Sequence, residues 1–456
     1  MRPLPVLLTS ILLTSVPATD LQAAEQVTEA GVRNVWVQVV PPRRGVLRAI
    51  TEGARCPAAH FDGQRIPMQE RARPSSDYDV LVCELVVPPA VERIEVAGRS
   101  LRNVTSKPQR VAVVGDTGCR MKAGHSLDDG FQNCGDPDDW EFAKVARQVA
   151  AWKPDLIIQV GDYIYREHEC PEGCGNCAGS PFNGPGMRMA TWNAEFFDPG
   201  KPMLEAAPIV FVRGDHEKCE RAGSGYFRFL DGSPLQPCTD FSDPYALDFE
   251  GLQLVVMDTV QAEGTSLSPE LVVDRYARDF EQAAKLATGN TWLVSHRPIW
   301  ALRPAPAAGA ATTTDACDNQ TIPDELIVQD LSVTVQHALA RSTLEGRLPD
   351  EVDLVLTGHI HLGEVLSFTG RRPPQMVVGI SGTKLLPSVS TDLVGKEIAG
   401  ERITHALLLS AHGFFGFDPQ PHDVWRADVR DVAGASLATC KVGDKVASCQ
   451  EPKTAP

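Results

Sequence analysis

The sequence has no excess of positive charge and, beyond its first residues, no long apolar run. Its 456 residues include 43 Lys and Arg against 59 Asp and Glu, which gives a formal net charge of −16. A chain this acidic is a poor electrostatic partner for nucleic acid or for anionic membranes. No apolar stretch after the N-terminus is long enough to span a bilayer, and no internal repeat is present. We therefore expect a protein that binds no nucleic acid and has no stable membrane association.

The first 24 residues have the pattern of a secretory signal peptide. Arg2 supplies a positive charge, residues 4–16 are mostly apolar, and small residues follow at Ala18 and at positions 23–24. The apolar run is too short to be a comfortable membrane anchor. We expect residues 1–24 to be a signal peptide and the mature protein to be secreted or periplasmic.

Twelve cysteines, an even number, fit an oxidising compartment in which disulfides form. The simplest expectations are three local pairs: Cys56 with Cys83, Cys219 with Cys238, and Cys440 with Cys449. The rest of the pairing stays open from the sequence. Cys170, Cys174 and Cys177 allow an alternative, a structural zinc site, although no fourth ligand is evident.

The chain after the signal peptide divides by pattern into a β-rich part and an α/β part. Residues 25–105 contain strand-like apolar runs and no helical periodicity, which predicts a small β-sandwich-like domain. In residues 109–430, strands alternate with helical segments such as 141–152 and 274–288, as in an α/β domain. Residues 431–456 are assigned to a C-terminal extension.

Three stretches of the α/β part are predicted from composition and periodicity. Residues 166–200 form a long insertion rich in Cys, Gly and Pro that is too polar for the core. Its aromatic residues, Trp192, Phe196 and Phe197, either line a substrate mouth or pack the loop. Residues 301–314 are expected to be a flexible loop, and residues 327–344 are expected to be helical.

Five apolar runs of the α/β part end in acidic residues or histidine. They are followed, in chain order, by Asp116, by Asp162 with Tyr165, by Asp215 with His216, by His296, and by His359 with His361. Ligands of open α/β sheets bind at the carboxyl ends of strands. Carboxylates and imidazoles suit Fe, Mn and Zn. The residues are too many for one tetrahedral ion and fit two ions, ~3.5–4 Å apart, that share a carboxylate.

In this order the motifs GD, GDxxY, G[N/D]HE, SHRP and GHxH resemble those of the calcineurin-like metallophosphoesterases, over roughly residues 111–386. GDxxY is most similar to the purple acid phosphatase branch. The resemblance implies an αββα sandwich catalytic domain, and larger purple acid phosphatases have a similar small β domain before it.

The resemblance also implies a set of ligands. The first metal, Fe(III) in that family, would be held by Asp116, Asp162, Tyr165 and His361, with Asp162 bridging. The second, a divalent ion (Fe, Zn or Mn), would be held by Asp215, His296 and His359. His216 would be catalytic, facing the phosphate and protonating the leaving oxygen or stabilising the transition state. The nucleophile would be a metal-bound hydroxide.

The sequence departs from the usual pattern of the family at two positions. Most calcineurin-like enzymes have His two residues after the first Asp, where this chain has Gly118, and Tyr165 is the candidate that replaces the lost ligand. The usual Asn of GNHE is Asp215 here, which adds negative charge to the second metal. Tyr165 as a packing aromatic and Asp215 as an outer residue of the site remain the alternatives. Arg120, Arg166 and Arg297 either contact phosphate or are solvated charges.

We predict an exported dinuclear metallophosphatase that acts on phosphate monoesters of small molecules. The alternatives are a phosphodiesterase with two divalent metals and a non-catalytic metal-containing binding protein in which Asp215 is the lesion. The physiological substrate and the oligomeric state are not determined by these patterns.

Overall fold

The computed structural model describes residues 31–124, 126–180, 186–307, 313–322, 326–330, 333–389 and 393–452. The predicted signal peptide lies outside them. Among the described residues, no helix combines the length and apolarity needed to cross a membrane.

Two large β-sheets form the centre of the molecule. The larger has the strand order β27-β26-β25-β24-β9-β12-β13-β1-β2-β6-β5. Its strands are β1 (Val32–Val40), β2 (Arg44–Thr51), β5 (Gln69–Ala72), β6 (Leu81–Val87), β9 (Val111–Val114), β12 (Leu156–Gln159), β13 (Ile209–Phe211), β24 (Gly413–Gln420), β25 (Val424–Asp431), β26 (Ser436–Gly443) and β27 (Val446–Gln450).

The second sheet has the order β14-β15-β16-β19-β21-β20-β23-β22. Its strands are β14 (Tyr245–Phe249), β15 (Leu252–Val256), β16 (Thr291–Val294), β19 (Val352–Thr357), β20 (Gly363–Phe368), β21 (Gln375–Val378), β22 (Glu397–Ile398) and β23 (Glu401–Leu409). In each sheet the middle strands run parallel, β9-β12-β13-β1 in the first and β15-β16-β19-β21 in the second. The carboxyl ends of the parallel strands within each sheet therefore lie at one edge.

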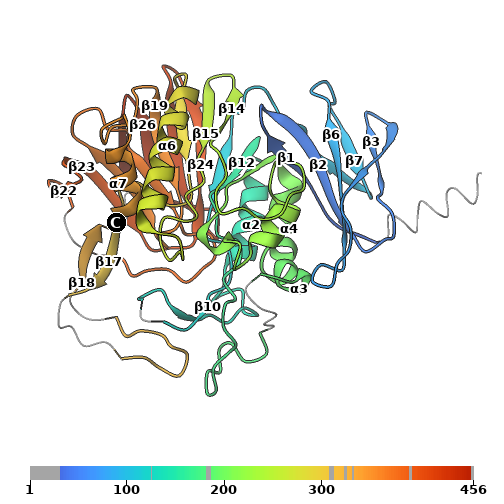
Figure 1. Ribbon diagram of the computed structural model, residues 1–456, viewed down its shortest axis with the longest axis horizontal. Helices are drawn as coiled ribbons and strands as arrows, with labels where there is room; N and C mark the ends of the chain where they lie inside the picture. The colour runs from blue at the N-terminus through green and yellow to red at the C-terminus, as the bar shows by residue number, and fades with distance from the viewer. Residues whose placement is uncertain are drawn as a thin grey trace, which may run out of the picture.

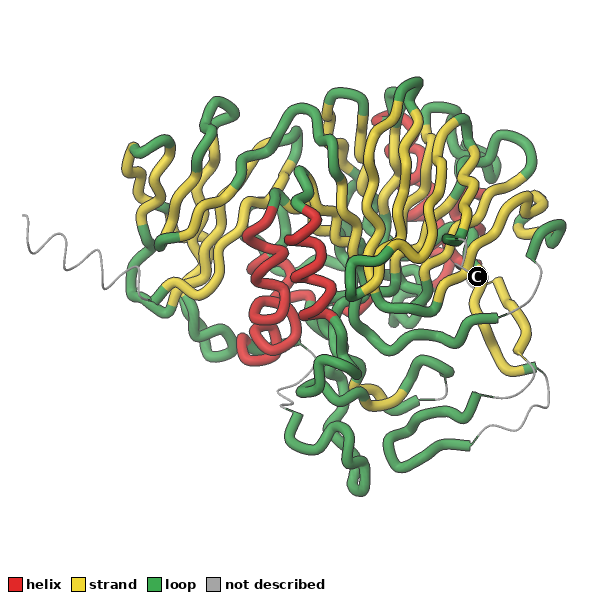
Figure 2. The backbone as a smooth tube through the Cα atoms, turned by 180° about the vertical axis from the view of Figure 1, so that it is seen from behind, coloured by secondary structure: helices red, strands yellow, loops and turns green. Residues whose placement is uncertain are grey.

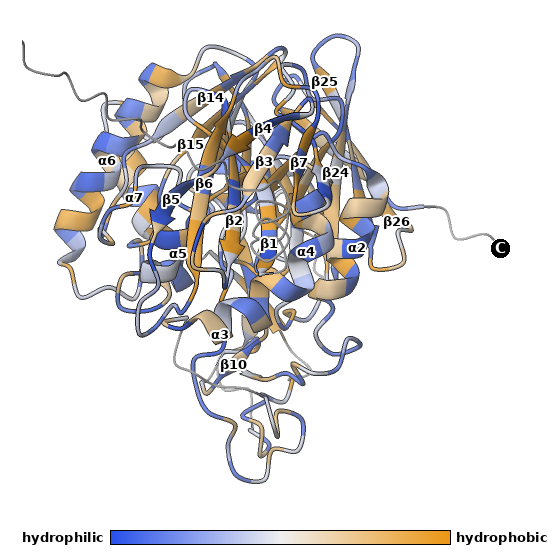
Figure 3. Ribbon diagram, turned by 90° about the vertical axis from the view of Figure 1, so that its right-hand side faces the viewer, coloured by the Kyte–Doolittle hydropathy of each residue, from blue (hydrophilic) through white to orange (hydrophobic). Residues whose placement is uncertain are grey.

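The two sheets pack face to face, and helices cover both outer faces. One apolar cluster joins Ile158 and Val210 of the first sheet to Leu254 and Leu356 of the second. Figure 3 shows the sheets between two pairs of helices, α2 (Phe142–Trp152) with α4 (Asp198–Ala206), and α6 (Pro269–Leu286) with α7 (Val333–Arg341). This is the expected αββα sandwich, and it is built because each sheet is apolar on both faces and needs two covers.

The N-terminal β layer expected from the sequence is present (blue in Figure 1). A four-stranded sheet of β3 (Ala58–Phe61), β4 (Gln64–Pro67), β7 (Ile94–Val96) and β8 (Arg99–Leu101) packs against β1, β2 and β6 through a shared apolar cluster. β1 also pairs in parallel with β13, with Gln38 opposite Ile209. The N-terminal strands therefore extend the larger sheet of the α/β part. At its other end, β26 and β27 come from the segment assigned to a C-terminal extension.

Long connections gather at the edge of the sheets where the parallel strands end (green in Figure 2). They include a hairpin of β10 (Met121–Lys122) and β11 (Gly130–Phe131), and another of β17 (Leu302–Pro306) and β18 (Leu326–Asp330). The second hairpin corrects two predictions, because its strands fall in the expected flexible loop of residues 301–314 and at the start of the expected helix of residues 327–344. The helix there is α7, which begins only at Val333.

The segment 166–200 is also not wholly a polar surface loop. From residue 189 it forms α3 (Met189–Trp192), a π-helical turn (η1, Asn193–Phe197) and the start of α4. Trp192, Phe196 and Phe197 are fully buried in the main core cluster, where their rings make edge-to-face contacts with one another and with Tyr163. Of the two alternatives, the substrate mouth is wrong, whereas the residues do have a packing role, in the main core and not only within their own segment. The Cys-, Gly- and Pro-rich composition of the residues before Met189 gave no sign of the short helical segment that follows them.

All twelve cysteines form disulfides, and the three local pairs expected from the sequence are among them. The other bonds are Cys119–Cys134, Cys170–Cys177 and Cys174–Cys317. The alternative of a zinc site is not realised, because the three sulfurs it needs are in disulfides.

Candidate metal centre

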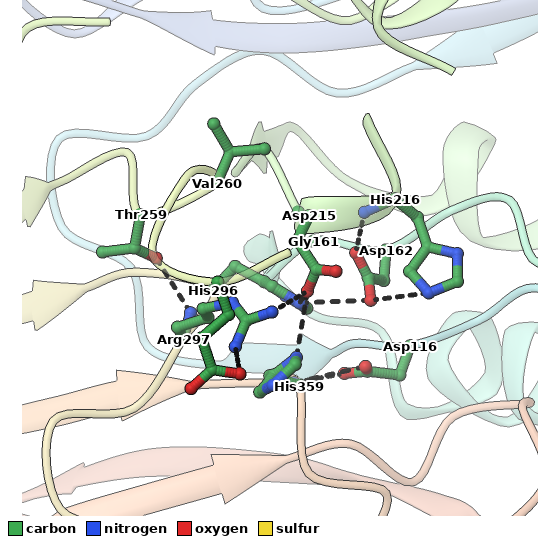
Figure 4. Close-up of polar contacts among 12 residues, drawn as sticks. Asp116, Gly161, Asp162, Asp215, His216, Thr259, Val260, His296, Arg297 and His359 are labelled. Atoms are coloured by element: carbon green, nitrogen blue, oxygen red, sulfur yellow. Dashed lines mark hydrogen bonds and ion pairs between the residues drawn. The ribbon is translucent and has the colours of Figure 1, made fainter. Parts of the chain in front are cut away.

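Six of the seven predicted ligands lie just past the carboxyl end of a parallel strand, and the seventh, Tyr165, lies further along the loop that begins with Asp162. Asp116 follows β9, Asp162 follows β12, Asp215 follows β13, His296 follows β16, and His359 and His361 follow β19. Because the two sheets face each other, their ligands meet between the sheet edges (Figure 4). The structure therefore brings together all seven predicted ligands and His216.

Three of these side chains converge on the phenol of Tyr165, which is fully buried. Its oxygen lies 2.8 Å from Oδ1 of Asp116, 2.8 Å from Oδ2 of Asp162 and 3.1 Å from Nε2 of His361. A phenol has one proton and donates to only one carboxylate at a time. The cluster therefore holds more hydrogen-bond acceptor oxygens than protons. A hard cation would satisfy these oxygens as its ligands.

Gly118 leaves room for this phenol. A Cβ at this position would lie 2.8 Å from Cδ2 of Tyr165 and 2.8 Å from the carbonyl oxygen of Tyr163. No side chain fits at residue 118 while Tyr165 occupies its place. The absence of histidine at position 118 and the position of the Tyr165 ring thus depend on the same packing.

A second group of possible ligands shares Asp162 with the first. Ligand atoms of Asp162, Asp215, His296 and His359 all lie within 4.8 Å of one another. Nε2 of His296 is 3.1 Å from Asp162 and 3.2 Å from Asp215, and Nδ1 of His359 is 3.0 Å from Asp215. The other ring nitrogen of His296 lies 2.8 Å from the carbonyl oxygen of Val160, which directs Nε2 to the carboxylates.

His216 lies beside the two groups and is held by other contacts. Its Nε2 is 3.7 Å from Oδ2 of Asp162, and its ring lies against that of Tyr165 at a centroid distance of 3.8 Å and an interplanar angle of 36°. Its Nδ1 is 2.8 Å from the carbonyl oxygen of Ile164 and 3.0 Å from a carboxylate oxygen of Glu167. His216 also lines a pocket, and its Nε2 is on the side of Asp162.

Burial and crowded negative charge shift the pKa values of these groups strongly. Burial, together with Asp116 and Asp162, raises the pKa of Tyr165 well above its usual value. Burial raises the pKa of Asp116 to about 6, against an opposing effect of His296. Burial acts to lower the pKa of His296, but the carboxylates, Asp162 foremost, raise it well above normal. Both shifts favour the protonated form, which is the neutral phenol of Tyr165 and the charged imidazole of His296.

The pKa values of two other imidazoles of the site, His216 and His359, are lowered. Burial and Arg221 lower the pKa of His216 to about 4. Burial and Arg297 lower the pKa of His359 to about 3. A neutral imidazole is the form that binds a metal or accepts a proton.

Two guanidinium groups flank the carboxylate of Asp215. Nη1 of Arg221 is 3.4 Å from its Oδ2, and Nη2 of Arg297 is 3.4 Å from its Oδ1. Each arginine also pairs with a second carboxylate, Glu167 and Glu263 respectively. The extra negative charge that Asp215 brings in place of the usual asparagine is thus compensated locally.

Sequence reasoning missed two buried glutamates that shape the ligand loops. Glu217 accepts hydrogen bonds from the backbone N–H groups of Asp162, Tyr163 and Gly214 at 3.0–3.2 Å. Glu195 accepts from the N–H groups of Cys119 and Tyr165. Glu217 could have been found as the final residue of the GDHE motif, whereas nothing in the sequence marks Glu195.

A polar pocket opens onto the two groups. It is lined by Arg120, Lys122, Ser126, Asp128, Asp129, Asp162, Asp215, His216, Arg221, Arg297, Arg303, His359, Ile360, His361 and Leu386. Of the three arginines considered from the sequence, Arg120 and Arg297 line it. Arg166 instead is buried against Glu195 and Trp140. None of the three is a solvated surface charge, since each is at most 6% exposed.

Comparison with known proteins agrees with this geometry. The model of the calcineurin-like phosphoesterase family matches residues 109–363. Among solved structures, the chain is similar to a purple acid phosphatase from yellow lupin (Lupinus luteus) seeds, with a TM-score of 0.53 and 12% identity over 92% of this chain and 77% of that one. It is also similar to PhoD, with a TM-score of 0.53 and 11% identity over 94% of this chain and 92% of that one. No curated protein matches the sequence. At such low identity the structural likeness concerns the fold alone.

Proposed function

The chain belongs to the calcineurin-like phosphoesterase family, and on that premise we propose that it is an exported, dinuclear metal-dependent phosphatase that hydrolyses phosphate monoesters. The observation that carries the proposal is the pair of ligand groups that share Asp162. One group is centred on Tyr165 and the other on Asp215. Six disulfides support export, because such bonds persist in oxidising compartments.

The residues divide into two metal sites. We assign Asp116, Asp162, Tyr165 and His361 to the first, and Asp162, Asp215, His296 and His359 to the second. A phenol among the ligands favours Fe(III) in the first site, while the imidazoles of the second suit Fe, Zn or Mn as a divalent ion. When bound, the two ions would lower the pKa of water and neutralise charge on a phosphate.

The protein supplies orientation and a proton. We assign His216 as the catalytic residue, because Ile164 and Glu167 hold its Nδ1, its Nε2 lies on the side of Asp162, and the residue lines the pocket. In its protonated form, which the negative charge of a bound phosphate would favour, it would protonate the leaving oxygen or donate a hydrogen bond as negative charge develops there. Arg221 and Arg297 line the same pocket and present positive charge to the phosphate.

The test is metal analysis combined with paired assays. The exported protein should contain about one iron and one other ion per chain, and it should hydrolyse an aryl phosphate monoester faster than the matching diester. Asp116→Ala, which removes a first-site ligand, should abolish the activity. A preference for the diester, with two divalent ions and no iron, would favour a phosphodiesterase. A protein that holds metals and hydrolyses neither ester would be a non-catalytic binding protein.

A further inference from the structure

A disulfide-closed hairpin that belongs to none of the five motifs lies over the first ligand group. The Cys119–Cys134 bond closes it and β10 pairs with β11 within it. At its end Asp129 N–H donates to the carbonyl oxygen of Ser126 at 2.9 Å, and Ser126 N–H donates to the Asp129 carboxylate at 3.0 Å. The hydrogen-bonded turn fixes the residues between them.

The turn is anchored beside the last motif by an apolar contact. Leu127 is 5% exposed and belongs to a cluster with Ile360 and Leu362, the two neighbours of His361 in the chain. Ala301, which precedes β17, is in the same cluster. The side chain that follows Leu127 is therefore held against His361 by packing on both sides of that histidine.

That side chain is Asp128, and it contacts the imidazole directly. Its Oδ2 lies 2.8 Å from Nδ1 of His361. The contact is a close ion pair and not an aligned hydrogen bond, because no group among the described residues meets hydrogen-bond geometry with this buried nitrogen. The opposite ring nitrogen, Nε2, is the one that faces Tyr165 at 3.1 Å and Asp116 at 3.5 Å.

Asp128 is itself fixed by two further contacts. Its Oδ1 accepts from the hydroxyl of Ser126 at 2.5 Å and pairs with the guanidinium of Arg303 on β17. Both carboxylate oxygens are thus occupied, and the side chain is only 8% exposed. A buried carboxylate held in this way has little freedom to rotate away from the imidazole.

We propose that Asp128 is a positioning residue of the first metal site, which keeps the proton of His361 on Nδ1 and thereby presents Nε2 to the metal. Arg303 and Ser126 hold Asp128 in the required orientation. The inference rests on the proposed function, since it concerns the same metal site. Carboxylates that accept from a ligating histidine fix its tautomer and its ring orientation.

The experiment measures the affinity of each metal site separately in the full-length, disulfide-bonded protein. Iron and the divalent ion are quantified after dialysis against graded concentrations of chelator, for wild type, Asp128→Asn, Asp128→Ala and Arg303→Gln. Asp128→Asn should weaken retention of the first-site ion about 10- to 100-fold and leave the second-site ion unchanged. Asp128→Ala should weaken it at least as much, and Arg303→Gln less.

Asp138→Asn is the matched control, because it removes a carboxylate from a following segment of the same loop region where the side chain is 83% exposed. It should retain both ions as wild type does. Melting of the metal-free proteins shows whether each variant is folded. Wild type without two ions would overturn the proposed function. Wild type with two ions, and Asp128 variants that keep the first ion or lose both equally, would overturn the positioning role alone.

Discussion

Asp215→Asn tests how charge is balanced in the metal centre. It keeps the size of the side chain and removes its negative charge, which Arg221 and Arg297 both approach to 3.4 Å. Two unit charges at that distance interact by about 5 kcal/mol when the effective dielectric constant is ~20. Each guanidinium spreads its charge and also pairs with a second carboxylate, so its interaction with Asp215 is weaker than this value. We therefore expect a coupling of about 1–3 kcal/mol between Asp215 and Arg297 in a double-mutant cycle.

The cycle compares wild type, Asp215→Asn, Arg297→Gln and the double variant. Asp215→Asn alone should weaken the second metal, because it removes an anionic ligand and leaves the charge of Arg297 uncompensated beside the cation. When Arg297 is already replaced by Gln, Asp215→Asn should lower the affinity for the divalent ion by a factor about 5- to 150-fold smaller than it does in wild type. The dissociation constant of the divalent ion, measured against a competing chelator, gives all four values.

The control is Arg275→Gln. Arg275 has a side-chain exposure of 24%, close to that of Arg221, and pairs with Asp243 and Asp279 away from the centre. It should show no coupling to Asp215→Asn beyond about 0.5 kcal/mol. Additive effects of Asp215→Asn and Arg297→Gln would refute the charge compensation. If Asp215→Asn instead raised turnover, the presence of aspartate at this position would be the reason that the protein has lost activity.

Three further outcomes are expected. Tyr165→Phe should abolish any visible absorption band and weaken the first metal, as seen by spectroscopy and metal analysis; an unchanged band would make Tyr165 a packing residue. His216→Ala should lower turnover about 10²- to 10⁴-fold while both ions are retained, and loss of both ions would contradict its non-ligand role. Replacing Cys174 and Cys317 by serine should lower the free energy of unfolding by about 5 kcal/mol, because the bond spans 143 residues. The Cys170–Cys177 disulfide spans 7 residues, and its removal should lower the free energy of unfolding about half as much. Urea denaturation measures both losses, and equal losses would contradict the loop-entropy reasoning.

The family and the sandwich were predictable because their signal lies in short local patterns. Asp116 and Asp162 each follow a run of apolar residues that is too short for a helix, and such runs fix both the strand and the place where it ends. The resemblance to calcineurin-like phosphoesterases is confirmed by the family match. The residue-by-residue assignment to each metal remains a prediction, supported by the way the side chains converge.

What the sequence did not reveal depends on contacts between distant segments. Trp192 and Phe197 are buried because the helical turns that carry them pack on the outer face of the larger sheet, and the composition before them gives no sign of it. Asp128 meets His361 across 233 positions of the sequence. Glu195 bonds two ligand loops from a segment with no motif. The contacts of such side chains depend on how distant segments pack in three dimensions, and short sequence patterns do not record that packing.

The ligand loops have a strained backbone that the surrounding structure holds in place. Asp116, Asp162 and His359 have φ values of 56°, 58° and 74°, in the left-handed region that non-glycine residues rarely adopt. Such conformations cost about 1–3 kcal/mol each and persist where the surroundings fix them. Here His359 N–H donates to the Asp116 carboxylate at 2.9 Å, and Asp162 N–H donates to buried Glu217 at 3.1 Å. These side chains thus fix one another's backbone as well as lying close together, so that contacts within the protein set the conformation of the loops.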